Sequence, residues 1–338
     1  MKAWAGEIGF DLCGIASATS PITLANFEEW LDRGFAGEMQ YLERRRDAYA
    51  DPERVLGGVA SVVLVAVNYH TGDGTPVEPG QGRVARYARI PQDYHDVVRE
   101  KLGRLASLLH EKVPGCRTRG IVDTAPVLER DFARQAGLGW FGKNTMLIHK
   151  RLGSWFLLGG LLTDIVLLPD EPHSTSHCGT CTRCLDACPT DAFPEPYVLD
   201  ATRCISYHTI EAARLPPPLG MVGEFGDWVF GCDICNEVCP WNRKAPVSSD
   251  PAMQPRADLS LVDCVDLLRM DETEFLRRFT GTPLSRPGLV GMQRNAALVL
   301  GNSGDRSMVP PLIAARGGAA PVVAAAIEWA IARLSTAE

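Results

Sequence analysis

Eight closely spaced cysteines constrain this 338-residue chain more than any other feature of its sequence. The first run reads Cys178-x2-Cys181-x2-Cys184-x3-Cys188-Pro189. The other four are Cys204, Cys232, Cys235 and Cys239, and Pro240 follows the last of them. Thiols at such spacing bind metals, inorganic clusters or one another, so the use of these eight decides the chemistry of the chain.

The first run has the spacing of bacterial ferredoxins, in which three thiolates bind one cluster and the cysteine before proline binds the other. The second run repeats this ending, with its first cysteine displaced upstream to Cys204. The ferredoxin rule therefore predicts two [4Fe–4S] clusters that exchange the cysteine before each proline. The predicted ligands are Cys178, Cys181, Cys184 and Cys239 for one cluster, and Cys188, Cys204, Cys232 and Cys235 for the other.

Structural zinc and disulfides are the alternatives for these thiols. Zinc sites favour Cys-x2-Cys pairs separated by a loop and use histidine as readily as cysteine. A triple-cysteine run closed by Cys-Pro, occurring twice, is more specific than one Cys-x2-Cys. Three further cysteines, Cys13, Cys116 and Cys264, are isolated, which is typical of reduced cytosolic thiols rather than of a secreted disulfide framework.

Other sequence features exclude some classes of protein. The chain has no uncharged apolar stretch of about 18 residues, and its start lacks the shape of a signal peptide. We therefore expect a cytoplasmic protein without membrane association. The formal net charge of −7 argues against a broad nucleic-acid clamp but leaves room for a local basic groove.

The chain has room for three domains, and two linkers divide it into 1–170, 171–245 and 256–338. In the first part, residues 61–67 form a continuous β-branched run, typical of a strand that helices cover on both faces. Residues 92–113 have the pattern of an amphipathic helix. In the last part, short Ala/Leu-rich helices resemble a HEAT-type repeat, which should dock on the preceding domain.

Asp123 ends a short predicted strand, 120–123, and precedes a helix over 127–136 that Pro126 should open. Open α/β folds place ligands at the carboxyl ends of strands, so Asp123 is a candidate site residue. The alternative is that Asp123 only caps the following helix. A glycine-rich loop follows at 137–145, and then a predicted strand pair, 146–149 with 154–168.

Three runs resemble the epoxyqueuosine reductase family. They are Val-Asp-Thr-Ala-Pro-Val-Leu-Glu-Arg at 122–130, the glycine-rich stretch at 136–145, and Gly-Cys-Asp-Ile-Cys-Asn-Glu-Val-Cys-Pro-Trp-Asn at 231–242. The resemblance extends from about Gly34 into the tail. It implies an α/β (α+β) fold with a nitroreductase-like catalytic domain, a bacterial-ferredoxin-like domain with two clusters, and a C-terminal α-helical HEAT-like region.

The resemblance also implies an activity. Such an enzyme uses cobalamin, fed with electrons by two [4Fe–4S] clusters, to reduce epoxyqueuosine to queuosine at the wobble position of tRNA with a GUN anticodon. The implied partners are that tRNA and an external electron donor of flavodoxin or ferredoxin type, and the implied state is a monomer. Asp123 matches the family's proton donor, a role that a carboxylic acid fills at neutral pH only if burial or a neighbour raises its pKa.

The resemblance further suggests which residues contact the cofactor. Asp93-x-His95 is similar to the start of a cobalt-ligating Asp-x-His-x-x-Gly motif, but Val98 stands in place of the glycine. We therefore expect base-off cobalamin without a histidine ligand. The candidate contacts are Arg46, Tyr94, His95, Asp123, Lys143, Asn144, Ser154, Ser206, Cys232 and Asp233. Asn144 and its neighbouring glycines are equally compatible with ordinary turn chemistry.

Arginines are the candidates for tRNA phosphate contacts. Arg83, Arg86 and Arg89 follow one another at three-residue spacing with no acid among them, and the tail adds Arg294, Arg306 and Arg316. A solvated surface is the alternative for each.

Two alternatives remain for the whole chain: a corrinoid reductive dehalogenase, and a non-catalytic iron–sulfur electron carrier.

Overall fold

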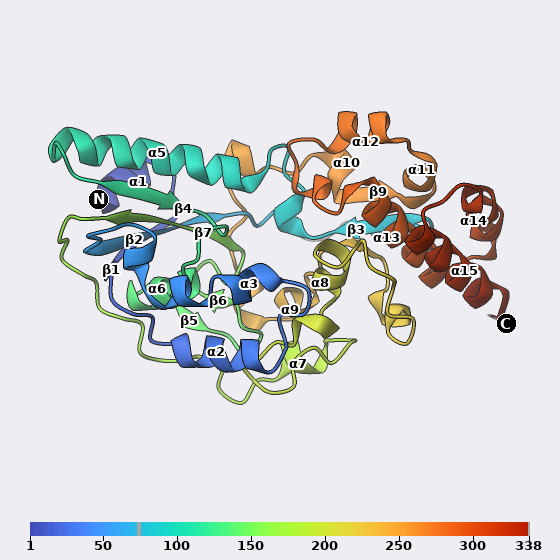
Figure 1. The fold of residues 1–338 in the computed structure, drawn as a ribbon, viewed down its shortest axis with the longest axis horizontal. Coiled ribbons are helices and arrows are strands. Elements are labelled where there is room, and N and C mark those ends of the chain that lie inside the picture. Colours follow the sequence, from blue (N-terminus) through green and yellow to red (C-terminus); the bar gives the residue numbers. More distant parts are fainter. Residues whose placement is uncertain (73–75, 337–338) are drawn as a thin grey trace.

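A four-stranded sheet forms the core of the N-terminal part in the computed structural model, which describes residues 1–72 and 76–336 (Figure 1). Its order is β1-β2-β7-β4, and each neighbouring pair is antiparallel. The strands are β1 (Leu12–Ser17), β2 (Ser61–Asn68), β7 (Phe156–Thr163) and β4 (Thr118–Ile121). Every residue of β2 is buried, as the β-branched run predicted.

Helices cover both faces of this sheet, which confirms the expectation from β2. On one face Val63 and Val65 pack with α1 (Lys2–Ile8) and α5 (Tyr94–Lys112). On the other face Val62 and Leu64 pack with α6 (Glu129–Gln135). Alternate β2 side chains therefore serve two separate apolar cores.

Three local predictions for this part are wrong. Because the sheet is antiparallel, the rule for open parallel sheets does not explain the position of Asp123. Helix α6 begins at Glu129 rather than just after Pro126, because residues 122–128 form turns. The predicted pairing of strand 146–149 with strand 154–168 is not observed. Instead β6 (Leu147–Ile148) pairs with β5 (Trp140–Phe141), and β7 pairs with β2 and β4.

A second, three-stranded sheet joins the three predicted parts of the chain. Its order is β8-β3-β9, with β3 (Gln81–Val84) parallel to β8 (Trp228–Phe230) and antiparallel to β9 (Leu261–Asp263). One strand comes from each of the segments 1–170, 171–245 and 256–338. The folded units therefore do not coincide with continuous stretches of sequence.

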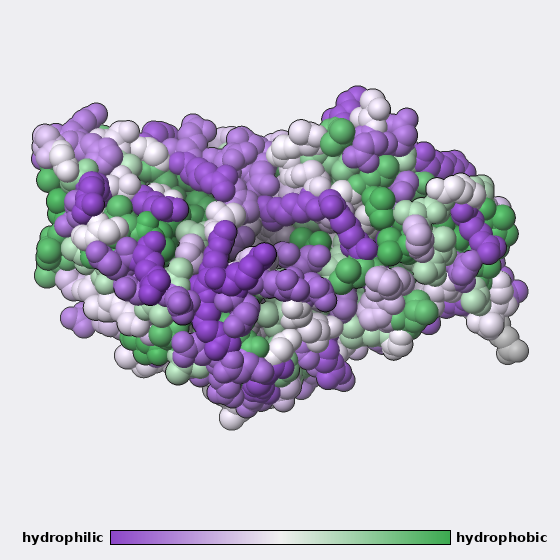
Figure 2. All heavy atoms as spheres, in the orientation of Figure 1, coloured by the Kyte–Doolittle hydropathy of each residue, from purple (hydrophilic) through white to green (hydrophobic). Residues whose placement is uncertain are grey.

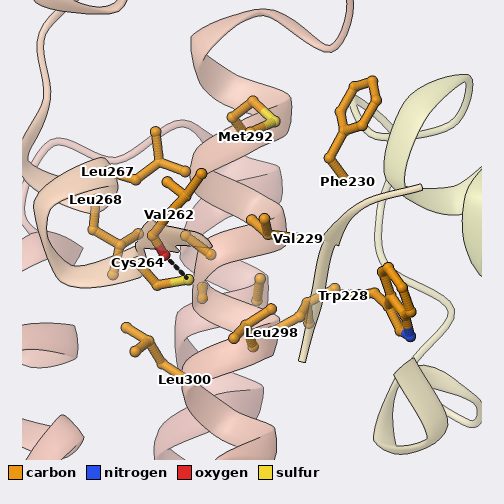
Figure 3. Close-up of a cluster of buried hydrophobic side chains, with 14 of the residues drawn as sticks. Trp228, Val229, Phe230, Val262, Cys264, Leu267, Leu268, Met292, Leu298 and Leu300 are labelled. Carbon is orange, nitrogen blue, oxygen red and sulfur yellow. Dashed lines mark hydrogen bonds between the residues drawn. The ribbon is translucent and has the colours of Figure 1, made fainter. Parts of the chain in front are cut away.

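The C-terminal helices pack on this second sheet. They are α11 (Cys264–Arg269), α12 (Glu272–Phe279), α13 (Gly288–Asn302), α14 (Val309–Arg316) and α15 (Pro321–Thr336). Figure 3 shows Val229 of β8 pointing toward α13, with Leu298 and Met292 among the buried side chains. Val84 and Ala85 belong to the same core, so the tail docks on the preceding parts as expected.

The remaining helices are short and surround the middle of the molecule. They are α2 (Leu24–Asp32), α3 (Gln40–Arg44), α4 (Arg46–Ala50), α7 (Arg183–Asp186), α8 (Ile205–Ile210), α9 (Ile234–Glu237) and α10 (Ala257–Ser260). Among the residues that the structure describes, none of the helices combines the length and apolar character needed to cross a membrane.

Candidate active site and cluster ligands

The eight clustered cysteines lie in a compact segment in which α7 and α9 contact each other. Cys184 lies in α7 and Cys235 in α9, and each helix is followed by a Cys-Pro pair. All eleven cysteines of the chain are free thiols in the structure. The disulfide alternative therefore has no support from the geometry.

The thiols form two electrostatic neighbourhoods. Burial raises the pKa of Cys184 to about 11, and the nearby Cys239, Cys178 and Cys181 add to the effect. Burial also raises the pKa of Cys232, to which Cys235 and Cys204 contribute, and the pKa of Cys204, to which Cys188 contributes. Burial also raises the pKa of Cys235, and both Cys184 and Cys188 contribute, so the two groups of thiols adjoin each other. Which four thiols bind each cluster stays a prediction.

Asp123 lies in the turn after β4 with a left-handed backbone, φ 57°. Its side chain is 66% exposed, and its Oδ2 accepts a hydrogen bond of 2.9 Å from the Tyr94 hydroxyl. Nε2 of His95 lies 3.5 Å from the same oxygen. The backbone N–H of Asp123 donates to Oε1 of Glu129 at 2.7 Å. Two side chains at the start of α5 thus hold this carboxylate, and one at the start of α6 holds its backbone.

The electrostatics of Asp123 differ from the expectation for a proton donor. Its interaction with His95, joined by the hydrogen bond from Tyr94, outweighs burial and holds its pKa below the usual value. The condition given for a proton donor, a pKa raised by burial or a neighbour, is therefore not met by Asp123 in this structure. Asp123 is a carboxylate at neutral pH, so it can release a proton only after it has received one from a neighbour.

Two neighbours have raised pKa values. Burial opposes protonation of His95, but its interactions with Asp123 and Asp93 outweigh that effect and raise its pKa. Burial, reinforced by the charge of Asp123, raises the pKa of Glu129 to about 8. Glu129 therefore holds a proton next to Asp123 near neutral pH, and His95 binds a proton more readily than a free imidazole does.

Several residues near Asp123 were not predicted. Arg45 donates through Nη1 to the carbonyl of Thr124 at 3.0 Å. Tyr41 and Glu211 lie close enough for the charge of Asp123 to raise the pKa of each, after burial as the main cause. Glu129 belongs to the run that resembles the reductase family, and that run was the only sequence feature that pointed to it. The others come from separate segments and have no common motif.

The predicted cofactor contacts divide into two sets. Tyr94, His95 and Asp123 converge, and Ser206 in α8 and Cys232 just before α9 are partly exposed. The partial exposure of Ser206 and Cys232 leaves these two side chains available to a ligand.

The other predicted contacts are engaged elsewhere. Asn144 and Ser154 are buried and hydrogen-bond to α9: Asn144 Nδ2 donates to the Cys235 carbonyl at 3.3 Å, and Ser154 Oγ donates to Asn236 at 3.0 Å. These two side chains therefore fasten the glycine-rich loop and the start of β7 to the cluster segment. Their contact with a cofactor stays a prediction.

Three charged candidates also differ from expectation. Arg46 pairs with Asp32 and Glu43 rather than facing Asp123, whose loop is contacted by Arg45 instead. Lys143 donates to the Gly179 carbonyl at 2.9 Å, beside Cys178. The Asp233 carboxylate is buried and accepts the backbone N–H of Arg86 at 2.7 Å.

The arginines predicted to contact tRNA do not form one exposed row. Arg86 and Arg89 are each 5% exposed, and Arg294 is fully buried. Arg86 forms ion pairs with Asp233 and Glu237, and Arg89 donates to the Val84 carbonyl. Arg86 and Arg89 follow β3, which runs through the interior, and Arg294 lies on the buried face of α13, where it donates to the His208 carbonyl. All three therefore bind protein groups. Arg83 remains partly exposed and pairs with Asp227, while Arg316 pairs with Glu328 on the surface.

Figure 2 shows a recess near the middle of this face, rimmed by long hydrophilic side chains. In Figure 1, α3, α8 and β3 approach one another at this place. Helix α3 belongs to the N-terminal part, α8 to the cluster segment and β3 to the three-stranded sheet that joins the parts of the chain. A ligand in the recess would lie among these three elements.

The fold and the site together define an oxidoreductase that connects a double iron–sulfur segment to an acid–base site in an α/β domain. Residues 177–242 match a family model described as a 4Fe-4S double cluster binding domain. Residues 50–124 match a model described as epoxyqueuosine reductase QueG, DUF1730. A Pseudomonas aeruginosa protein named epoxyqueuosine reductase is 39% identical, over 98% of this chain and 93% of that protein. The chain belongs to the epoxyqueuosine reductase family.

Solved structures of this family have the same fold. One epoxyqueuosine reductase, in complex with an epoxyqueuosine-modified tRNA-Tyr stem loop, superposes with a TM-score of 0.90 at 31% identity and covers 98% of this chain and 88% of its own. The Bacillus subtilis enzyme, solved with its catalytic aspartate loop swung out of the active site, gives 0.89 at 30% identity, with the same coverage. The similarity spans all three parts of the chain.

Proposed function

We propose that this protein reduces epoxyqueuosine to queuosine in tRNA, and that Asp123 passes a proton to the oxygen released from the epoxide. The observation that supports this most directly is the convergence of Tyr94, His95 and Asp123 at an exposed carboxylate. Full-length similarity to a relative that binds an epoxyqueuosine-modified stem loop supports the choice of substrate. Because the substrate is tRNA, we place the activity in the cytoplasm.

We infer that base-off cobalamin occupies the recess in Figure 2, where a bound corrinoid would supply low-valent cobalt for reductive opening of the epoxide. Partly exposed Ser206 and Cys232 would line its cluster side, and Tyr94 and His95 the side of Asp123. Both ring nitrogens of His95 face protein groups, with Nδ1 toward Asp93 and Nε2 toward Asp123. That geometry fits a cofactor without a histidine ligand.

Proton transfer is the part of the reaction that this chain's own residues perform. Removal of the epoxide oxygen as water consumes two electrons and two protons. The ring-opened oxygen is basic and needs a proton as its negative charge develops. Asp123 accepts a proton from a neighbour with a raised pKa and releases it to that oxygen, returning to the carboxylate form.

We further propose the finer features of the assembly. Cys178, Cys181, Cys184 and Cys239 hold one [4Fe–4S] cluster, and Cys188, Cys204, Cys232 and Cys235 hold the other. The N-terminal part is nitroreductase-like, and α13–α15 form a HEAT-like unit. The enzyme acts as a monomer on tRNA with a GUN anticodon and receives electrons from a flavodoxin- or ferredoxin-type donor. Arg83 and Arg316 remain candidates for phosphate contacts because they are partly exposed.

The test is a direct assay. The purified protein, with reconstituted clusters and cobalamin, is incubated anaerobically with a strong reductant and an epoxyqueuosine-containing stem loop. Digestion and mass spectrometry should show the nucleoside lighter by one oxygen. A protein that binds clusters and corrinoid yet leaves the nucleoside unchanged is an electron carrier, and the proposal is then wrong.

A further inference from the structure

Arg286 lies between α12 and α13 and reaches across to the start of α5. Its Nη2 donates to Asp93 Oδ1 and Oδ2 at 3.2 and 3.1 Å and lies 2.7 Å from Nδ1 of His95. Its guanidinium also lies over the Tyr94 ring, 5.2 Å from the centroid. One side chain of the C-terminal part therefore touches both residues that hold the Asp123 carboxylate.

Nδ1 of His95 has two neighbours that require opposite proton occupancy. Oδ1 of Asp93, 2.8 Å away, is an acceptor and needs an N–H on the ring. Nη2 of Arg286, 2.7 Å away, is a donor and needs a lone pair there. A ring nitrogen offers one or the other, never both. Asp93 thus favours the imidazolium form of His95, and Arg286 opposes it.

We propose that Arg286 is a positioning residue that, in opposition to Asp93, determines how readily His95 gives its proton to Asp123. The inference rests on the proposed role of Asp123. One proton moves from Nε2 of imidazolium His95 to Oδ2 of Asp123, leaving neutral imidazole, and then to the oxygen of the opened epoxide, restoring the carboxylate. The transfer consumes no reductant beyond that of the reduction itself. By opposing the imidazolium, Arg286 makes His95 a stronger acid.

The groups around His95 come from several elements. Asp93 and Tyr94 belong to the start of α5, and Tyr87 packs edge-on against the Tyr94 ring with centroids 5.6 Å apart. Asp123 and Glu129 come from the β4–α6 connection. Among these groups Arg286 carries the positive charge, so its removal leaves His95 facing carboxylates.

The experiment compares Arg286→Met, Arg286→Lys and Asp93→Asn with the wild type in prereduced enzyme. First-turnover rates on the epoxyqueuosine stem loop are measured across pH. In Arg286→Met the fall of the rate at high pH, the basic limb of the pH–rate profile, should move up by about one pH unit, because the imidazolium persists. The maximal rate of that profile should fall by about 10-fold. In Asp93→Asn the basic limb should move down. Arg286→Lys keeps the charge and should keep the limb near its wild-type position.

A second measurement applies even if a variant has no activity. Nitrogen NMR of protein labelled at its histidine rings follows protonation of His95 without substrate, and a His95→Gln spectrum assigns the His95 signals. A higher titration midpoint for His95 in Arg286→Met supports the proposal, and an unchanged midpoint or an unmoved basic limb overturns it. Failure of the wild type to convert the stem loop would instead show that the proposed function is wrong.

Discussion

At the scale of single residues, the backbone at Asp123 is as informative as its side chain. Its φ of 57° is a conformation that costs most residues about 1–2 kcal/mol but that Asp and Asn adopt more readily. The Glu129 carboxylate accepts the Asp123 N–H and stabilises this turn. The turn aims the carboxylate at Tyr94 and His95 instead of leaving it to cap α6.

Asp123→Asn separates proton transfer from structure. Asparagine tolerates the left-handed backbone but cannot carry the proton, so turnover should fall by on the order of 100-fold or more while clusters and cobalamin still bind. Single-turnover assays and visible spectra measure the two effects. Asp191→Asn, at φ 48° in an exposed turn, is the matched control and should be nearly neutral. Near-normal conversion by Asp123→Asn would rule out the role.

Glu129 gives a pH prediction. Its folded-state pKa is raised from 4.5 to about 8, so the folded protein holds a proton that the unfolded chain has already lost in this range. Its contribution to stability is therefore present below pH 4.5 and is lost as pH rises through about 8. In Glu129→Gln, which keeps an acceptor for the Asp123 N–H, the melting temperature should fall less steeply over that interval. Parallel pH profiles for the two proteins would contradict this.

At the scale of elements, α7 and α9 show which features a sequence can predict. The cysteine spacing is local, and it predicted that the two cysteine runs lie together, as the contact between α7 and α9 shows. The burial of β2 followed from its continuous β-branched run, and the span of α5 from its strong helical periodicity. The antiparallel sheet did not follow, because a β-branched run carries no information on the direction of its neighbours. Nor did the approach of Arg286 to His95, since tertiary packing alone brings α12–α13 to α5.

If each cluster takes the cysteine before proline from the other run, mutation of Cys188 should damage the cluster held by the second run. Cys188 follows α7 in sequence, but its electrostatic neighbours include Cys204 and Cys235. Cys188→Ala should therefore impair the cluster of Cys204, Cys232 and Cys235 and leave the other intact. Iron analysis and electron paramagnetic resonance after partial reduction would identify the surviving cluster. Cys13→Ala, at an isolated thiol, should leave both clusters intact, whereas loss of the Cys178/Cys181/Cys184 cluster in Cys188→Ala would refute the pairing.

At the scale of the whole molecule, Arg86 joins parts of the chain that the sequence suggested were separate domains. It pairs with Asp233 and Glu237 across that boundary, and its guanidinium lies 4.6 Å from the centroid of the Trp155 ring. The spacing of the arginines suggested that Arg86 contacts a tRNA phosphate. In the structure it is instead buried between two carboxylates and an aromatic ring. Its role is to hold the cluster segment against the N-terminal sheet.

Arg86 and Arg83 should therefore respond differently to mutation. Arg86→Met leaves the buried Asp233 without its partner, which costs about 3 kcal/mol or more, so the melting temperature should fall by at least ~5 °C. Arg83→Met removes a partly exposed pair with Asp227 and should cost about 1 kcal/mol or less. Arg83→Glu should weaken stem-loop binding and lower its salt dependence by about one phosphate contact. Equal thermal shifts for the two methionine variants would contradict this assignment.

The three-stranded sheet has a consequence for how the protein is made. Strand β3 leaves the ribosome early, yet Arg83 has to wait for Trp228 and Leu261, its partners in β8 and β9. Pairing so distant along the chain forms late in folding. All eight cluster cysteines precede Leu261, so they emerge from the ribosome before the last of these strands can add. During that interval the nascent chain presents its thiols to the machinery that delivers iron and sulfide.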